Sequence, residues 1–388
     1  MDPTKSDAAT SGSASNSSRN SKFDLQPPSS PFLLRHGRRY LRDAPYPLPV
    51  DLPELQRQNL LTCLASSIFG SPLCSPFTTS KPLRKVLEIA CGSAYWSSLC
   101  HSYITELGYT GVGFTGVDIV QLSPNLKQQG LDWRFVEHDL RKVPLPFEDE
   151  EFDLVVMKDL SLVIPQGAKS QRLMDECIRV LRKGGSLEIW ECDHIVRTLL
   201  PHPPTTGHTP HDKQYAEETG TYLISPSTPF GAAQNKYLQD FNGWLQEALD
   251  RRKLSAAPCA RITPTLLQEP ETLAEIGYRR VAIPLGEFRW EQDETHGRLG
   301  AKRGKAKATK SGRKGSYLTL EQASYRHTAL LIVIQLMESL EPLLKEVSGK
   351  NQEEWQRWWG WMMTDLLENR NVGNGECLEI GAWWATKV

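Results

Sequence analysis

The chain lacks several features that mark other classes of protein. Its longest apolar stretch, 329–334, is far shorter than the ~18 residues of a membrane-spanning helix. The polar, Ser-rich N-terminus holds no apolar core of the kind that a secretory signal needs. The eight cysteines form no CxxC pair and no zinc-like spacing, so free thiols in a reducing compartment are expected. These absences predict an intracellular protein without stable membrane insertion and without a metal site.

Net charge is almost absent as well. The formal charge of -1 gives no general attraction to nucleic acid, so direct nucleic-acid binding is not expected. Seven cations are nevertheless concentrated in residues 302–314, which read K-R-G-K-A-K-A-T-K-S-G-R-K. This segment is predicted to be a solvated loop, and a loop of this composition can direct nuclear import without folding.

Composition divides the chain into five parts. Residues 1–30 are rich in Ser and Asn, so a disordered tail is expected there. Four prolines between 45 and 53 predict a stiff extended segment, which together with a following helix forms an N-terminal part, 31–83. A core is expected at 84–290 and a disordered basic loop at 291–317. Residues 318–388 are predicted to supply C-terminal helices and a last strand that completes the core.

Apolar strand-like runs alternate with helix-like segments through most of the chain. Strands are predicted at 84–89, 114–119, 133–136, 152–157, 186–190, 278–290 and 377–386. Helices are predicted at 54–69, 96–107, 170–181, 237–254, 319–341 and 352–368, with Lys183, Gly184 and Gly185 closing the third and Pro342 ending the fifth. The pattern predicts an α/β fold, a doubly wound, mostly parallel seven-stranded Rossmann-like sheet with added helices.

Acidic residues stand at the ends of three successive strands. Glu88 ends the first, Asp118 ends the second and Asp139 follows the third. Carboxylates at this edge of a parallel sheet face the ligand crevice, where the amine, ribose diol and adenine amino group of S-adenosylmethionine would offer them donors. The carboxylate of that cofactor could bind the backbone N–H groups that open the helix near Ser93. A nicotinamide dinucleotide fits less well, because the G-x-G-x-x-G turn is absent and Glu88 would repel the pyrophosphate.

The ordered motifs resemble those of class I S-adenosylmethionine-dependent methyltransferases. The matching stretches within 84–193 are V-L-E-I-A-C-G-S-A, G-V-D-I-V, H-D-L, F-D-L-V-V-M-K-D-L and R-V-L-R-K-G-G-S-L-E-I-W. The flanking P-Y-P-L-P-V-D-L-P-E-L-Q-R-Q and the closing G-A-W-W-A-T-K resemble the fungal LaeA-like branch and, more loosely, its VapB/VipC-type members.

The resemblance implies a role for each matching position. Glu88 and the turn Ala90, Cys91, Gly92 and Ser93 would hold the methionine portion of the cofactor. Asp118 would take the ribose hydroxyls, and Ile119 would pack beside the adenine. Asp139 would accept from the adenine amino group, and Leu140 would offer its backbone. Lys158 and Asp159 would line the side where the acceptor arrives. Alanines replace the usual glycines at 90 and 94. This is expected to narrow the turn without excluding binding, since alanine tolerates right-handed helical and extended backbone geometry.

The catalytic group is not identified by the sequence. An activated sulfonium methyl needs positioning more than a strong catalyst, so the family can lack a fixed base. Asp159, Asp193 and His194 are the candidates, although a capping or solvent-facing role is expected for His194 ahead of a catalytic one. Cys91 is expected to be a small turn residue rather than a nucleophile.

Three functions remain open at this point. The first is a methyltransferase that acts on a protein or on a small metabolite. The second, implied by the LaeA-like resemblance, is a regulatory protein of fungal development or secondary metabolism, with or without catalysis. It would form a heteromer with another methyltransferase-like chain and would be found in cytoplasm and nucleus. The third is a nicotinamide-dependent oxidoreductase, which the missing glycine pattern disfavours.

Overall fold

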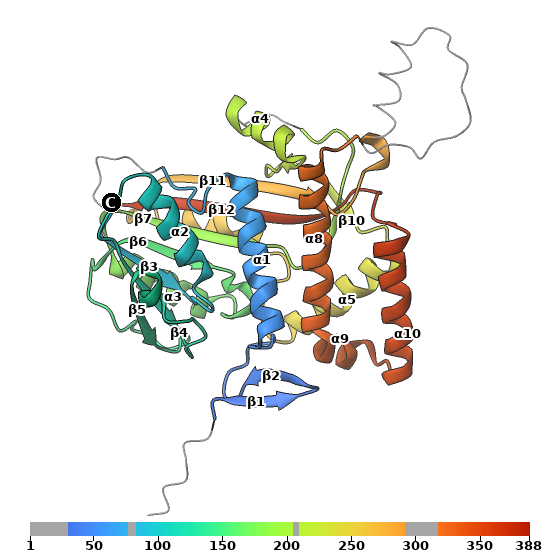
Figure 1. Cartoon of the computed structure of the whole chain (residues 1–388), viewed down its shortest axis with the longest axis horizontal. Coiled ribbons are helices and arrows are strands. Elements are labelled where there is room, and N and C mark those ends of the chain that lie inside the picture. The colour runs from blue at the N-terminus through green and yellow to red at the C-terminus, as the bar shows by residue number, and fades with distance from the viewer. Residues whose placement is uncertain (1–29, 77–82, 205–208, 292–316) are drawn as a thin grey trace, which may run out of the picture.

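The fold is built on one large sheet, seen from its broad side in Figure 1. The computed structural model describes residues 30–76, 83–204, 209–291 and 317–388, and every structural statement below concerns these residues. Five neighbouring strands are parallel: β5 (Asp132–Glu137), β4 (Gly113–Asp118), β3 (Lys85–Ile89), β6 (Phe152–Lys158) and β7 (Leu181–Cys192). Their carboxyl ends therefore meet along one edge of the sheet.

Antiparallel strands extend the sheet beyond β7. The long strand β12 (Glu376–Lys387) pairs with β7 on one side and with β11 (Leu273–Pro284) on the other. Short strands add to these: β8 (Arg197–Leu199), β9 (Tyr222–Leu223) and β10 (Phe230–Ala232). The sheet thus has ten strands where seven were expected. A separate hairpin, β1 (Phe32–Arg35) with β2 (Arg38–Leu41), was not predicted.

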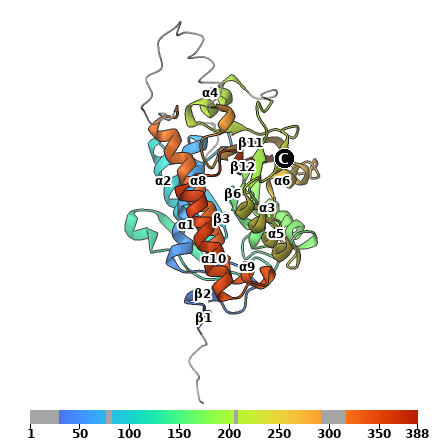
Figure 2. The ribbon, with the colours of Figure 1, turned by 90° about the vertical axis from the view of Figure 1, so that its right-hand side faces the viewer.

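Helices cover both faces of the sheet, as Figure 2 shows end-on. On one face lie α1 (Leu52–Phe69), α2 (Tyr95–Glu106) and α8 (Leu320–Ser339), and on the other lie α3 (Ala168–Val180) and α6 (Cys259–Leu266). Alternate residues of the central strand β6 point to opposite faces of the sheet and pack against different helices. Leu154 and Val156 pack in the core with α2, whereas Val155 and Met157 pack in the core with α3 and α6.

Three further helices form a cap beside the sheet: α5 (Lys236–Asp250), α9 (Glu341–Ser348) and α10 (Gln352–Met363), with a π-helical turn η3 (Thr364–Glu368) after α10. Helix α4 (Pro210–Thr219) lies apart from this cap and contacts α8 and β9. Trp355 and Trp358 of α10 are buried against Trp244 of α5, at ring-centroid distances of 5.9 and 4.9 Å. Trp355 and Trp358 are therefore part of the hydrophobic core.

Two helix boundaries differ from the predictions. Lys183, Gly184 and Gly185 do not cap α3, because the chain turns extended at Leu181 and β7 begins there, with an irregular register around the glycines. Pro342 lies in the first turn of α9, so it begins a helix as well as following one. The N-terminus of α8 carries a capping box of Thr319 and Gln322.

Two predicted segments cannot be compared with the structure. The disordered tail and the basic segment 302–314 lie outside the described residues. Within the described part, no single helix is long and apolar enough to cross a membrane; only α8 and α9 taken together, bent by 67°, would pass by length and composition.

Candidate functional site

The carboxyl ends of four parallel strands surround one cavity of about 100 Å³. From the sheet edge, the lining residues are Ala90 and Gly92 after β3, Asp118 and Ile119 at β4, Asp139 and Leu140 after β5, and Lys158 and Asp159 at β6. A chain segment before α1 and the first turns of that helix supply the opposite wall. Seven of the ten predicted cofactor contacts thus line a single cavity.

Asp118 is the centre of the hydrogen bonding on this edge. Its Oδ2 accepts from the backbone N–H of Gly92 at 2.9 Å, and its Oδ1 accepts from the N–H of Ile119 at 2.7 Å. Burial raises the pKa of Asp118 to about 6, although both N–H groups oppose that rise. Each oxygen still has a lone pair to spare, so the carboxylate can accept from a vicinal diol in the cavity.

The turn after β3 has an unusual backbone. Ala90 and Ala94 both have φ of +55°, and Gly92 lies between them with φ of +49°. The sequence interpretation assumed that the alanines would adopt right-handed or extended geometry, and this is wrong. They adopt the left-handed conformation that glycine favours, so the turn keeps its shape with some backbone strain.

Asp139 lines the cavity, but its carboxylate already has a partner. Arg141 donates from Nε to Oδ1 and from Nη2 to Oδ2, both at 2.8 Å. Burial alone would raise the pKa of Asp139, but the hydrogen bonds and charge of Arg141 outweigh burial and lower it. Asp139 therefore stays ionised, and an adenine amino group would have to share it with the guanidinium.

Three of the predicted cofactor residues lie outside the cavity lining. Glu88 is 1% exposed beneath the turn, where its Oε2 accepts from the hydroxyl of Ser97 on α2 at 2.5 Å. Burial raises the pKa of Glu88 to about 7. Cys91 packs in the core with α2, and the hydroxyl of Ser93 donates to Asn59 of α1. These residues shape the turn from behind, whereas the prediction placed them against the cofactor.

Of the three catalytic candidates, only Asp159 lines the cavity. It forms an ion pair with Lys158 there. Burial alone would lower the pKa of this lysine, but the charge and hydrogen bond of Asp159 outweigh burial and raise it. His194 lies off the cavity, with its Nε2 2.8 Å from the hydroxyl of Ser161, and burial lowers its pKa to about 4. The expectation of a capping or solvent-facing histidine is wrong, because His194 is 6% exposed and its ring makes internal contacts.

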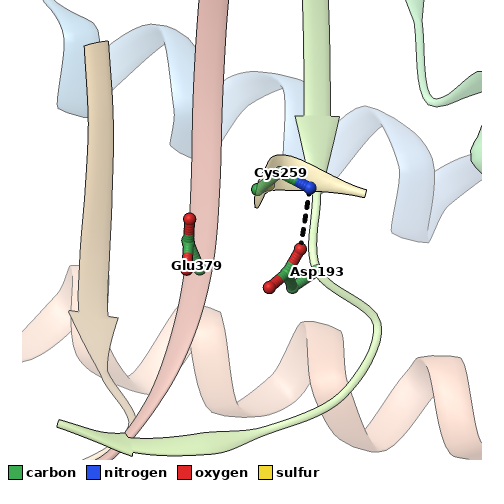
Figure 3. Close-up of side chains that lie close together, drawn as sticks. All are labelled: Asp193, Cys259 and Glu379. Carbon is green, nitrogen blue, oxygen red and sulfur yellow. Dashed lines mark hydrogen bonds between the residues drawn. The ribbon is translucent and has the colours of Figure 1, made fainter. Parts of the chain in front are cut away.

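Asp193 belongs to a separate buried cluster with Cys259 and Glu379, shown in Figure 3. The backbone N–H of Cys259 donates to Asp193 at 3.0 Å. Arg197 pairs with both carboxylates, and Arg280 donates from Nε to Glu379 at 2.8 Å. Two guanidinium groups thus neutralise two carboxylates, and burial raises the pKa of the Cys259 thiol well above its usual value. The cluster is an ion-pair network rather than a set of metal ligands.

The wall before α1 is the part of the site that sequence reasoning missed. Leu41, Ala44, Pro45, Tyr46, Pro49 and Val50 line the cavity from this segment. Arg38 holds it to the N-cap residue Asp51 of α1 (Nε to Oδ2, 2.6 Å), and Gln58 donates to the hydroxyl of Tyr46 at 3.2 Å. The proline-rich P-Y-P-L-P motif was the available signal, but it predicted only an extended chain.

Part of the chain is similar in sequence to known methyltransferases. The profile of a family described as a methyltransferase domain matches residues 86–185. Phthiotriol/phenolphthiotriol dimycocerosates methyltransferase 1 of Mycobacterium ulcerans is 37% identical over 106 residues, which are 27% of this chain and 36% of that protein. Phosphatidylethanolamine N-methyltransferase of Cereibacter sphaeroides is 29% identical over 117 residues, or 30% of this chain and 54% of that protein. The chain thus spans about a third to a half of the length of these curated relatives.

Solved structures resemble the chain over a longer range but more loosely. Phospholethanolamine N-methyltransferase 2 of Haemonchus contortus, in complex with phosphomonomethylethanolamine and S-adenosylhomocysteine, is 13% identical, with a TM-score of 0.36 over 85% of this chain and 58% of that one. Residues 86–185, the segment that matches a methyltransferase domain, contribute Ala90, Gly92, Asp118 and Asp139 to one cavity.

Proposed function

We propose that the chain is an S-adenosylmethionine-dependent methyltransferase whose active site is the cavity at the strand ends. The observation that carries this proposal is the meeting of Gly92, Asp118, Asp139 and Lys158, from four different strand ends, around one space. A bound cofactor would place its ribose diol at Asp118 and its adenine between Ile119 and Leu140. A Cβ atom at Gly92 would meet only Gln58 Oε1 at 3.6 Å, so the turn is open to a ligand.

The chemistry asks the protein mainly for positioning. S-adenosylmethionine would supply an activated methyl group. An acceptor atom would attack the methyl carbon in line with the carbon–sulfur bond, that bond would break, and S-adenosylhomocysteine would leave. The wall of Tyr46, Pro49 and Val50 would shield the cofactor from water, and the Lys158–Asp159 pair at the end of β6 would face the acceptor. An acceptor with a proton to lose would give it to Asp159, since this carboxylate is the catalytic candidate that lines the cavity.

The acceptor that we propose is a small molecule, methylated on oxygen or nitrogen. The cavity is narrow and closed on one side by the N-terminal wall, which suits a small acceptor better than a folded protein surface. The names of the curated relatives, which are lipid-directed methyltransferases, agree with this class.

A regulatory role in fungal development or secondary metabolism is the second candidate. It rests on the LaeA-like sequence motifs, which lie in the wall of the cavity (45–58) and in β12 (381–387). The same resemblance supports a heteromer with a methyltransferase-like chain in cytoplasm and nucleus, with or without a need for catalysis. Deletion of 302–314 should shift the protein towards the cytoplasm if the basic segment directs import; an unchanged distribution would contradict that role.

Transfer of a labelled methyl group tests the proposal. The full chain is incubated with labelled S-adenosylmethionine and a small-molecule fraction from the source cells, and labelled products are separated. Wild type and Glu137→Ala should label a product, whereas Asp118→Ala should not. Glu137 is the matched control because it pairs with Asp118 across β4 and β5 but is exposed and outside the cavity. Equal labelling by all three proteins would overturn the assignment.

The regulatory candidate has its own test in the cell. Asp118→Ala would replace the natural protein, and development and metabolite output would be compared with those of the Glu137→Ala strain. Loss of function only in the Asp118 strain would show that the role depends on the cofactor. Full function in both strains would favour a scaffold that acts through its partners and would contradict a catalytic role.

A further inference from the structure

A second and larger cavity, of about 560 Å³, lies on the opposite side of the sheet from α1. It opens between α3 and α6, above β6 and β7, and none of the described residues lines both this cavity and the cofactor cavity. Its walls are mainly apolar; they include Met157, Ile164, Met174, Ile189 and Ile262. A space of this size with such walls is typical of sites for small molecules.

One acidic side chain reaches the floor of this second cavity. Glu191 of β7 is 7% exposed and lines the cavity together with Ser161. Its Oε1 accepts from the backbone N–H of Ser161, and its Oε2 accepts from the hydroxyl of Ser161, both at 2.8 Å. Within the described ranges, no cation forms an ion pair with Glu191. A buried carboxylate without a countercharge is costly, so the site by itself favours the neutral carboxyl and a bound cation would favour the ionised form.

The neighbouring groups do not supply that charge. Lys158 is paired with Asp159, whose own negative charge disfavours ionisation of Glu191. His194 reaches the carboxylate only through the hydroxyl of Ser161, which can donate to one of its two neighbours at a time. Arg261, at the mouth of the cavity, donates to the side-chain oxygen of Gln166. Burial and the charge of Asp159 raise the pKa of Glu191 to about 8.

We propose that this second cavity binds a small amphiphilic amine, whose ammonium group pairs with Glu191 while its apolar part lies between α3 and α6. The ammonium would give the buried carboxylate the cation that the described protein groups do not provide. The free lone pairs of Glu191 would accept its N–H groups, and Ser161 would keep the carboxylate in place. This ligand site is additional to the cofactor cavity and does not depend on methyl transfer.

Calorimetry with three probes of equal chain length tests this proposal. Octylamine, octanol and octanoate are titrated into the full chain at pH 9, where Glu191 is ionised and an alkylamine is still protonated, as a lysine is. Octylamine should bind most tightly and octanoate least. Glu191→Gln should weaken octylamine at least about tenfold, because the charge-assisted hydrogen bonds are lost, and should leave octanol nearly unchanged.

Two further variants keep the result interpretable. Glu188→Gln changes a buried glutamate of the same strand whose hydrogen bonds run to Cys74, Ser75 and Trp190, and it should leave octylamine binding intact. Ala260→Trp fills the mouth of the cavity from an exposed position and should weaken all binding there. Equal affinity for octanol and octylamine, or unchanged octylamine binding in Glu191→Gln, would overturn the proposal. S-adenosylmethionine is titrated separately, so failure there would count only against the proposed function.

Discussion

Replacement of Glu88 by glutamine should change how the stability of the fold depends on pH. Burial raises the pKa of this carboxyl from 4.5 to about 7, despite the opposing hydrogen bond from Ser97 and the charge of Lys158. Because the pKa is higher in the folded state than in the unfolded chain, the neutral carboxyl contributes its full free energy of unfolding below pH 4.5. This contribution falls as the pH rises from 4.5 and is lost above 7. At 1.36 kcal/mol per pH unit, the full loss is about 3 kcal/mol.

Urea denaturation, followed by tryptophan fluorescence at pH 5 and at pH 8, measures this effect. Glu88→Gln keeps the acceptor for Ser97 but cannot ionise, so it should escape the loss. The stability of the variant relative to wild type should improve by about 2–3 kcal/mol from pH 5 to pH 8. The exposed Glu137→Gln serves as the control and should parallel wild type. A Glu88 variant that also parallels wild type would refute the argument that this carboxyl is buried and neutral at pH 5.

Three further predictions concern the turn, the cofactor and the cap. Ala94→Gly should raise the free energy of unfolding by about 1 kcal/mol in a thermal melt, because φ of +55° strains alanine. The control Ala65→Gly lies in helix α1 and should lower the free energy of unfolding. Affinity for S-adenosylmethionine should fall as the pH drops below about 6, because protonated Asp118 accepts poorly from the ribose diol; a flat affinity between pH 5 and 8 would contradict that contact. Trp355→Ala should cost about 3–5 kcal/mol in urea denaturation, since its ring is 2% exposed between Trp244 and Trp358; a cost below 1 kcal/mol would argue against a packed cap.

The edge of the sheet could be predicted because its signals are local. Polar residues end strands β4 and β6, and parallel strands bring such ends together, so Asp118 and Lys158 line one cavity. The orientation of a side chain at a strand end could not be predicted in the same way. Glu88 turns towards Ser97 of α2, and nothing in the run V-L-E-I distinguishes this orientation from one into the crevice.

Contacts between distant segments could not be predicted from the sequence. The wall over the cavity depends on the pairing of Arg38 with Asp51. The ion-pair network depends on the pairing of Glu379 on β12 with Arg197 on the neighbouring strand β8. Strands of two or three residues, such as β9 and β8, are too short for an alternating pattern to mark them. The pairing of Asp139 with Arg141 depends on a turn whose shape the sequence H-D-L-R does not specify.

The most direct test of the central claim is the dissociation constant of S-adenosylmethionine, measured by calorimetry and compared with that of NAD. The wild-type chain and Glu137→Ala should bind S-adenosylmethionine equally and NAD weakly or not at all. Asp118→Ala should lose at least about tenfold in affinity, as expected for a carboxylate that accepts from the ribose diol. Undiminished binding in Asp118→Ala, or a preference for NAD, would contradict the assignment of the cavity at the strand ends.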